Sequence, residues 1–124
     1  MLSPKSQTIT GWILTALSSL VLLASAAAKF IQPAGFTDGF SHMGWPIQLA
    51  VALGILEISC TAIYLLPRTS VLGAILLTGY LGGAVATHLR IGDPYFGPVL
   101  LGVMVWGGLY FRNPRVRALI PLID

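Results

Sequence analysis

Apolar residues are gathered along this chain into four long stretches, separated by short polar segments. The stretches cover residues 10–30, 46–66, 70–89 and 94–111. Each is near the ~20 residues that an α-helix needs to cross the ~30 Å hydrocarbon core of a bilayer. The pattern therefore predicts an all-α protein, an integral membrane four-helix bundle with short loops that forms a single transmembrane domain over residues 1–124.

Composition supports the same fold class. Of the 124 residues, 56% are hydrophobic and only 9% are charged, and the mean hydropathy is +0.85. A soluble domain has roughly 25% charged residues. The net charge of +3 does not indicate nucleic-acid binding, because no basic face with interleaved aromatic residues is present. We assign this charge to membrane topology and to contacts with anionic membrane lipids.

The first apolar stretch shares some features with a secretory signal peptide, since Lys5 precedes it and small residues lie near Ser25. It is longer than the roughly 7 to 15 apolar residues of a signal peptide. We therefore interpret it as a retained first helix.

The distribution of cations predicts an orientation. Five of them fall on one side of the predicted membrane, and two on the other. The larger group is Lys5, Arg68, Arg112, Arg115 and Arg117, and the smaller is Lys29 and Arg90. Because Lys and Arg beside short loops stay on the cytoplasmic side, both termini are predicted to be cytoplasmic. The loop over residues 31–45 then lies outside, and its glycines and aromatic residues favour a cap or lid that folds back on the bundle.

Glu57 lies in the middle of the second apolar stretch, which otherwise has no charge. An ionisable residue inside a membrane is costly and commonly marks a functional site. Helical spacing puts Gly54, Glu57, Cys60 and Tyr64 on one face that is mostly small or polar. The carboxyl group is therefore predicted to point into the bundle.

Candidate partners for Glu57 are Lys29, His88 and Arg90, with Tyr64 and Tyr80 as hydrogen-bonding alternatives. Glu57 lies ~16 Å along its helix at ~1.5 Å per residue, whereas Lys29 and Arg90 are expected near the interface. Long cationic side chains and a water-filled pocket would bridge that depth. Two interpretations stay open: a buried ion pair that only fixes helix packing, and a polar pocket for a quinone headgroup or a lipid.

Cysteine and histidine usage limits the redox chemistry of the chain itself. Cys60 is the single cysteine, so a dithiol mechanism within one chain is excluded. We interpret it as a packing residue. His42 and His88 fall in different elements, and the sequence has no metal-binding motif, so neither haem nor a metal is expected.

Several sequence runs resemble the DoxX-like family of small membrane proteins, from about residue 10 to residue 112. The resemblance is carried by Ala28-Lys29-Phe30, Gly54-Ile-Leu-Glu57, Leu65-Leu-Pro-Arg-Thr69 and Leu72-Gly-Ala-Ile-Leu-Leu-Thr-Gly-Tyr-Leu-Gly-Gly-Ala-Val-Ala-Thr-His-Leu-Arg90. It implies a four-helix protein of the bacterial cytoplasmic (inner) membrane. Family members have been tied to sulfur and quinone redox chemistry, as small subunits of thiosulfate:quinone oxidoreductase, and to membrane complexes that counter oxidative stress. Lys29, Glu57, His88 and Arg90 match recurring polar positions of the family.

We therefore expect a membrane subunit or accessory factor of a redox-associated complex, and not an autonomous enzyme. The alternatives are a quinone-linked oxidoreductase subunit in which Glu57 relays a proton, and a carrier of lipids or small molecules. The ligand-binding candidates are Lys29, Glu57, Tyr64, Tyr80, His88 and Arg90, and no catalytic residue is assigned. Expected partners are membrane lipids, a quinone or small amphipathic ligand, a soluble redox protein, and a second copy of the chain. The homodimer is suggested by Gly102, Gly107 and Gly108 in the last helix.

Overall fold

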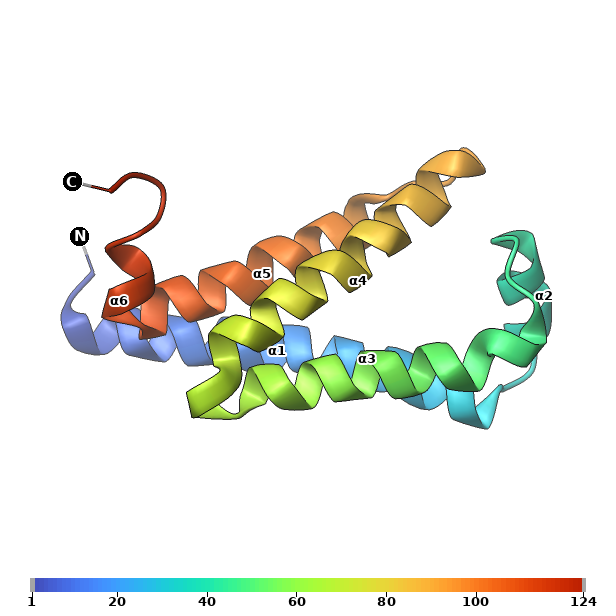
Figure 1. Ribbon diagram of the computed structural model, residues 1–124, viewed down its shortest axis with the longest axis horizontal. Coiled ribbons are helices and arrows are strands. Elements are labelled where there is room, and N and C mark those ends of the chain that lie inside the picture. The colour runs from blue at the N-terminus through green and yellow to red at the C-terminus, as the bar shows by residue number, and fades with distance from the viewer. Residues whose placement is uncertain (1, 124) are drawn as a thin grey trace.

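The computed structural model describes residues 2–123, and it is built from helices joined by short turns (Figure 1). Four long helices correspond to the four apolar stretches. They are α1 (Pro4–Ile31), α3 (Ala50–Leu65), α4 (Ser70–Arg90) and α5 (Phe96–Arg112). The predicted all-α class is confirmed.

The expected count of four helices is too low for the described residues, because two short helices are added. Helix α2 (Phe36–His42) lies in the first loop, and α6 (Pro114–Arg117) follows α5. The rings of Phe36 and Phe40, one turn apart, stack with centroids at 5.1 Å and give α2 a buried apolar contact. Helix α6 starts where the Asn113 side chain accepts a hydrogen bond from the Arg115 N–H, with proline at the first position.

Helix boundaries also differ from the predicted ones. Helix α1 begins at Pro4 instead of residue 10, because the Ser3 hydroxyl caps its first turn at 3.1 Å from the Ser6 nitrogen. A 3-10 turn, η1 (Ile47–Leu49), precedes α3, and another, η2 (Pro67–Thr69), precedes α4. Helix α5 begins at Phe96 instead of residue 94, with Tyr95 at its N-cap and without a side-chain hydrogen bond to the first turn.

The long helices form a ring in which α1 packs against α3 and α5, and α4 also packs against α3 and α5. Both termini lie at one end of the molecule, which we call the closed end. There α3 and α4 lie close together around Tyr64 and Gly73 (Figure 1). At the opposite, open end, which carries Lys29, α2 and Arg90, the α4–α5 pair diverges from α3.

Glycines explain the close packing at the closed end. A Cβ atom on Gly73 would overlap the backbone of Tyr64, and one on Gly11 would lie 2.6 Å from the Arg112 nitrogen. Gly79 and Gly83, further along α4 toward the open end, have no such neighbour within 4 Å. The helices therefore touch where glycine allows it and separate beyond that point.

The glycines of α5 contact their own chain. Gly108 faces Thr15 of α1. A Cβ atom added to Gly107 would lie 3.4 Å from the Leu14 side chain, and one added to Gly102 would lie 3.9 Å from the Leu81 side chain of α4. The homodimer therefore stays a prediction that these glycines no longer motivate.

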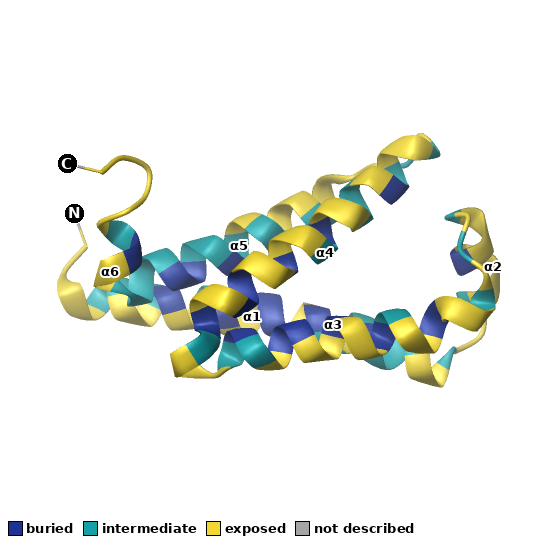
Figure 2. Cartoon of the chain, viewed as in Figure 1, coloured by how far each residue is buried: buried dark blue, intermediate teal, exposed yellow. Residues whose placement is uncertain are grey.

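The outer surface of the bundle carries large apolar side chains (Figure 2). Leu20, Ile55 and Val103 are 64%, 53% and 63% exposed, while Tyr64, Leu77 and Leu109 are fully buried. Three helical segments are long and apolar enough to cross a membrane, namely Pro4–Ile31, Ile47–Leu65 and Pro67–Arg90, and Phe96–Arg112 is shorter, with 17 residues. Apolar side chains thus cover the surface as well as fill the core, and such a surface suits a lipid environment.

Replacing Gly73 with alanine should separate α3 from α4. We expect Gly73→Ala to lower the free energy of unfolding by about 2 kcal/mol, because the new methyl group overlaps the Tyr64 backbone. Gly79→Ala is the matched control, since its methyl group enters open space and alanine favours helix. Thermal or SDS-induced unfolding in detergent measures both. Equal stabilities of the two variants would contradict the close-packing account.

Candidate functional site

Glu57 is paired with Lys29 across the α1–α3 contact. The Lys29 Nζ atom lies 2.9 Å from Glu57 Oε1, and the two side chains are 13% and 3% exposed. Gly54, one turn before Glu57, allows the close approach, because a Cβ atom there would lie 3.2 Å from the Lys29 Cβ. Of the three candidate partners Lys29, His88 and Arg90, the structure places Lys29 against the carboxylate.

Ser25 completes this ion pair and was not among the predicted site residues. Its hydroxyl accepts a hydrogen bond from Lys29 Nζ at 2.8 Å and donates one to Glu57 Oε1 at 3.2 Å. Ser25 precedes Lys29 by four residues, which puts both on one face of α1. That spacing was the available signal, but serine is too common in apolar helices to be singled out by it. The hydroxyl ties the two charges together and fixes which carboxylate oxygen the lysine binds.

A cavity of about 640 Å³ adjoins the ion pair in the open half of the bundle. It is lined from α1, α2, α3, α4 and α5, and its surface is mostly apolar. The polar side chains in its wall are Ser25, Lys29, Glu57, Tyr80, Thr87 and His88, together with the indole of Trp45. A few converging polar groups in an otherwise apolar hollow of roughly 300 to 1,000 Å³ are typical of small-molecule sites.

His88 and Tyr80 enter this cavity from α4. His88 Nδ1 lies 2.7 Å from the carbonyl oxygen of Ala84. A carbonyl only accepts hydrogen bonds, so Nδ1 carries the proton, and Nε2 of the neutral ring is an acceptor. The carboxylate, the imidazole and the phenol therefore line one cavity, and ligand binding by them stays a prediction.

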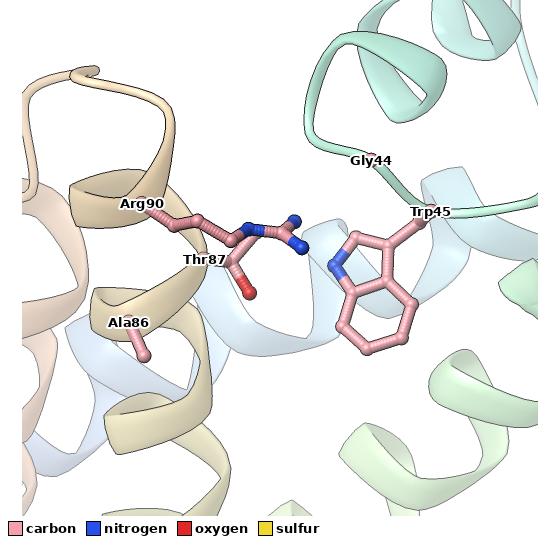
Figure 3. Close-up of a pocket in the computed structure, with 5 residues that line it drawn as sticks. All are labelled: Gly44, Trp45, Ala86, Thr87 and Arg90. Carbon is pink, nitrogen blue, oxygen red and sulfur yellow. The ribbon is translucent and has the colours of Figure 1, made fainter.

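Arg90 lies at the mouth of the open end and does not line this cavity. Its guanidinium group donates to the carbonyl oxygen of Met43, in the turn after α2. It lines a smaller hollow of about 220 Å³ with Gly44, Trp45, Ala86 and Thr87 (Figure 3). Figure 3 shows the guanidinium extending from α4 toward the Trp45 indole. Arg90 thus joins α4 to the first loop instead of binding Glu57.

A second contact holds the first loop in the same place. His42 Nε2, at the end of α2, lies 2.9 Å from Asp93 Oδ2 in the turn between α4 and α5. With the Arg90 contact, it connects the α2 segment to the far side of the open end. The loop therefore folds back on the bundle, and Phe36, Phe40 and Met43 line the cavity from it.

Tyr64 belongs to a separate cluster at the closed end. Its hydroxyl donates to the carbonyl oxygen of Val105 at 2.7 Å and lies 3.3 Å from Thr15 Oγ1. Arg112 Nε donates to the same threonine at 3.0 Å, and its guanidinium carbon lies 4.5 Å from the centre of the Trp12 ring. Tyr64 does not line the cavity, so it is not the hydrogen-bonding alternative at Glu57 that its helical face suggested.

The family model described as the DoxX-like family matches residues 13–108. The chain belongs to the DoxX-like family. No curated protein and no solved structure matches it. Family membership and three helices of spanning length make it a transmembrane protein. The family match covers Ser25, Lys29, Glu57, Tyr80 and His88, so the polar wall of the cavity lies within the family region.

Removing one partner of the ion pair in this DoxX-like protein should be much more damaging than removing both. We expect Glu57→Leu to lower the free energy of unfolding by about 3 kcal/mol, because it leaves the Lys29 ammonium buried without its counter-charge. Lys29→Met with Glu57→Leu should recover most of that loss, and Glu57→Gln should keep the fold. A double-mutant cycle of unfolding in detergent measures the coupling. Additive losses in the double variant would show that the pair is not a stabilising unit.

Proposed function

We propose that this DoxX-like protein is a membrane subunit or accessory factor of a redox-associated complex, and that its cavity holds a small amphipathic molecule beside Glu57. The observation that carries the proposal is the mostly apolar cavity of about 640 Å³ with Glu57, Tyr80 and His88 in its wall. An apolar body fits the helices, and a polar end fits this wall. A quinone or a related ring compound is the first candidate.

The redox association rests on the family and on what one chain lacks. Cys60 is the single cysteine and is buried, so the chain cannot form a dithiol by itself. Chemistry on a bound ring would then need a partner, which we propose is a soluble redox protein. In this proposal Glu57 binds the ligand and contributes a fixed charge. The alternative is a quinone-linked oxidoreductase subunit in which Glu57 passes a proton to the bound ring.

We further propose that both termini are cytoplasmic and that the membrane is the bacterial inner membrane. The support is the position of the cations in the elements that lie toward each end. The start of α1, the turn η2, the end of α5 and α6 carry Lys5, Arg68, Arg112, Arg115 and Arg117 toward the closed end, whereas the end of α1 and the end of α4 carry Lys29 and Arg90 at the open end. Basic residues beside short loops are retained in the cytoplasm. The cavity would then open toward the outer half of the bilayer.

A carrier of lipids or small molecules is the second candidate, and the rim of the cavity favours it. Val21 and Leu56 line the cavity and are 50% and 49% exposed on the lipid-facing surface. An apolar ligand could therefore pass between the cavity and the membrane without crossing a polar barrier. A carrier would release its ligand readily, whereas a subunit with a structural ligand would retain it.

Filling the cavity should remove a bound molecule without unfolding the protein. We expect Gly83→Phe to abolish a small molecule that native mass spectrometry finds in protein extracted gently from its own membrane. Gly83 lines the cavity and has open space at its Cβ position. Gly82→Phe is the matched control, because Gly82 has the same free space but does not line the cavity. Retention of the molecule by Gly83→Phe would place it elsewhere.

A further inference from the structure

The hydrogen-bonding groups around Glu57 are used unequally. Lys29 Nζ has contacts with Glu57 Oε1 at 2.9 Å, Ser25 Oγ at 2.8 Å and the Ser25 carbonyl at 3.4 Å. An ammonium group has three N–H donors and no acceptor. The lysine therefore has no further donor to offer, and the hydroxyl proton of Ser25 is used on Oε1 as well.

The second carboxylate oxygen of Glu57 is left for the cavity. Both contacts to the carboxylate, from Ser25 and Lys29, are made by Oε1. Within residues 2–123, the Ser25 and Lys29 contacts leave Oε2 without a short hydrogen bond, and the Tyr80 phenol is the side chain that faces the same carboxylate. In this described part of the chain, two polar side-chain atoms, Ser19 Oγ and Arg112 Nη2, are fully buried without a partner, and Oε2 is not one of them, so it remains accessible. Because Glu57 lines the cavity, Oε2 is accessible from it.

The hydrogen-bonding groups in the cavity wall that remain free for a ligand are thus mainly acceptors. An ionised carboxylate only accepts hydrogen bonds, and His88 Nε2 is an acceptor in the tautomer set by Ala84. The Tyr80 hydroxyl, beside Glu57, can both donate and accept, and the indole of Trp45, which also lines the cavity, carries a donor only. A ligand that fills the cavity displaces water from Glu57 Oε2 and has to replace that hydrogen bond, or leave a charged oxygen desolvated.

Resting on the proposed binding function, we infer that the cavity selects an apolar molecule whose inner end carries a hydrogen-bond donor, an O–H or N–H group. A phenolic hydroxyl suits the site, because it can donate to Glu57 Oε2 while its oxygen accepts from Tyr80. A molecule with a carbonyl or ether oxygen at that end satisfies Tyr80 alone. A ligand carboxylate would meet the Glu57 charge without a free cation beside it.

The test compares two ligands that differ only in the donor. Wild-type protein in lipid nanodiscs is titrated calorimetrically with 4-hexylphenol and with 4-hexylanisole, and partitioning into empty nanodiscs is subtracted. We expect the phenol to bind about ten-fold more tightly, which is the size of one hydrogen bond to a charged acceptor. Equal affinities, or tighter binding of the anisole, would overturn the inference while leaving the cavity a ligand site. Binding of neither compound would overturn the inference and the proposed function together.

Two variants locate the preference. In Glu57→Gln the amide oxygen can stay with Lys29, and the NH₂ group then faces the cavity as a donor. The preference for the phenol should fall to about two-fold or less. Asp38→Asn is the control, because Asp38 is an exposed acid on α2 that does not line the cavity, and it should keep the ten-fold ratio. A ten-fold ratio that persists in Glu57→Gln would contradict the assignment to Glu57. If the glutamine variant does not fold, the wild-type comparison decides by itself.

Discussion

A carboxylate in the hydrocarbon part of a membrane is tolerated only if a counter-charge reaches it, and the open half of this bundle is arranged around that requirement. Lys29 approaches Glu57 because Gly54 removes the side chain that would separate α1 from α3. Ser25 links the two charges through one hydroxyl. The desolvation of both ions is offset by short contacts and hydrogen bonds, which is the condition under which a buried pair persists. The α1–α3 contact is thereby fixed at the depth of the cavity.

The division of the molecule into a closed and an open end follows from the placement of small residues. Gly11, Gly73 and Gly108 let backbones meet at the closed end, and Tyr64 and Arg112 fill the remaining space with hydrogen bonds and ring contacts. Further along α4, Gly79 and Gly83 meet no neighbour. A tightly packed end thus supports a hollow one, and the contacts of Arg90 and His42 with the α2 segment and the α4–α5 turn limit how far the open end can spread.

Much of the fold could be predicted because hydrophobic length and helix-ending residues act locally. The four apolar stretches became the four long helices, and the face of α3 that carries Glu57 points inward as its spacing indicated. The short helices α2 and α6 were missed, since each depends on a few contacts, such as the Phe36–Phe40 stack. Apolar periodicity over four to seven residues is too brief to reveal them.

The site could be predicted only in part, because its geometry depends on contacts between helices that are distant in the sequence. The sequence offered Lys29, His88 and Arg90 as charge partners of Glu57, but the choice of Lys29 over Arg90 depends on how far α4 diverges from α3, which no local pattern encodes. Tyr64 shares a helical face with Glu57, yet at seven residues' distance it lies near the closed end, with Val105 as its acceptor. Ser25 became visible only when Lys29 and Glu57 were placed together. A shared face therefore identifies direction, whereas the depth of a side chain in the bundle comes from the packing of whole helices.

The account depends most on the claim that the Glu57 carboxylate is ionised, with Oε1 bound by Lys29 and Ser25 and Oε2 free for a ligand. Glu57 is the only glutamate in the chain, so protein labelled with glutamate carrying ¹³C at the side-chain carboxyl reports on this single carboxyl group by isotope-edited infrared spectroscopy. In nanodiscs at neutral pH, we predict an isotope-shifted carboxylate band that moves when 4-hexylphenol binds and disappears in Glu57→Gln. A protonated carboxylic acid band in its place would contradict the ion pair with Lys29, and with it the proposed selectivity of the cavity.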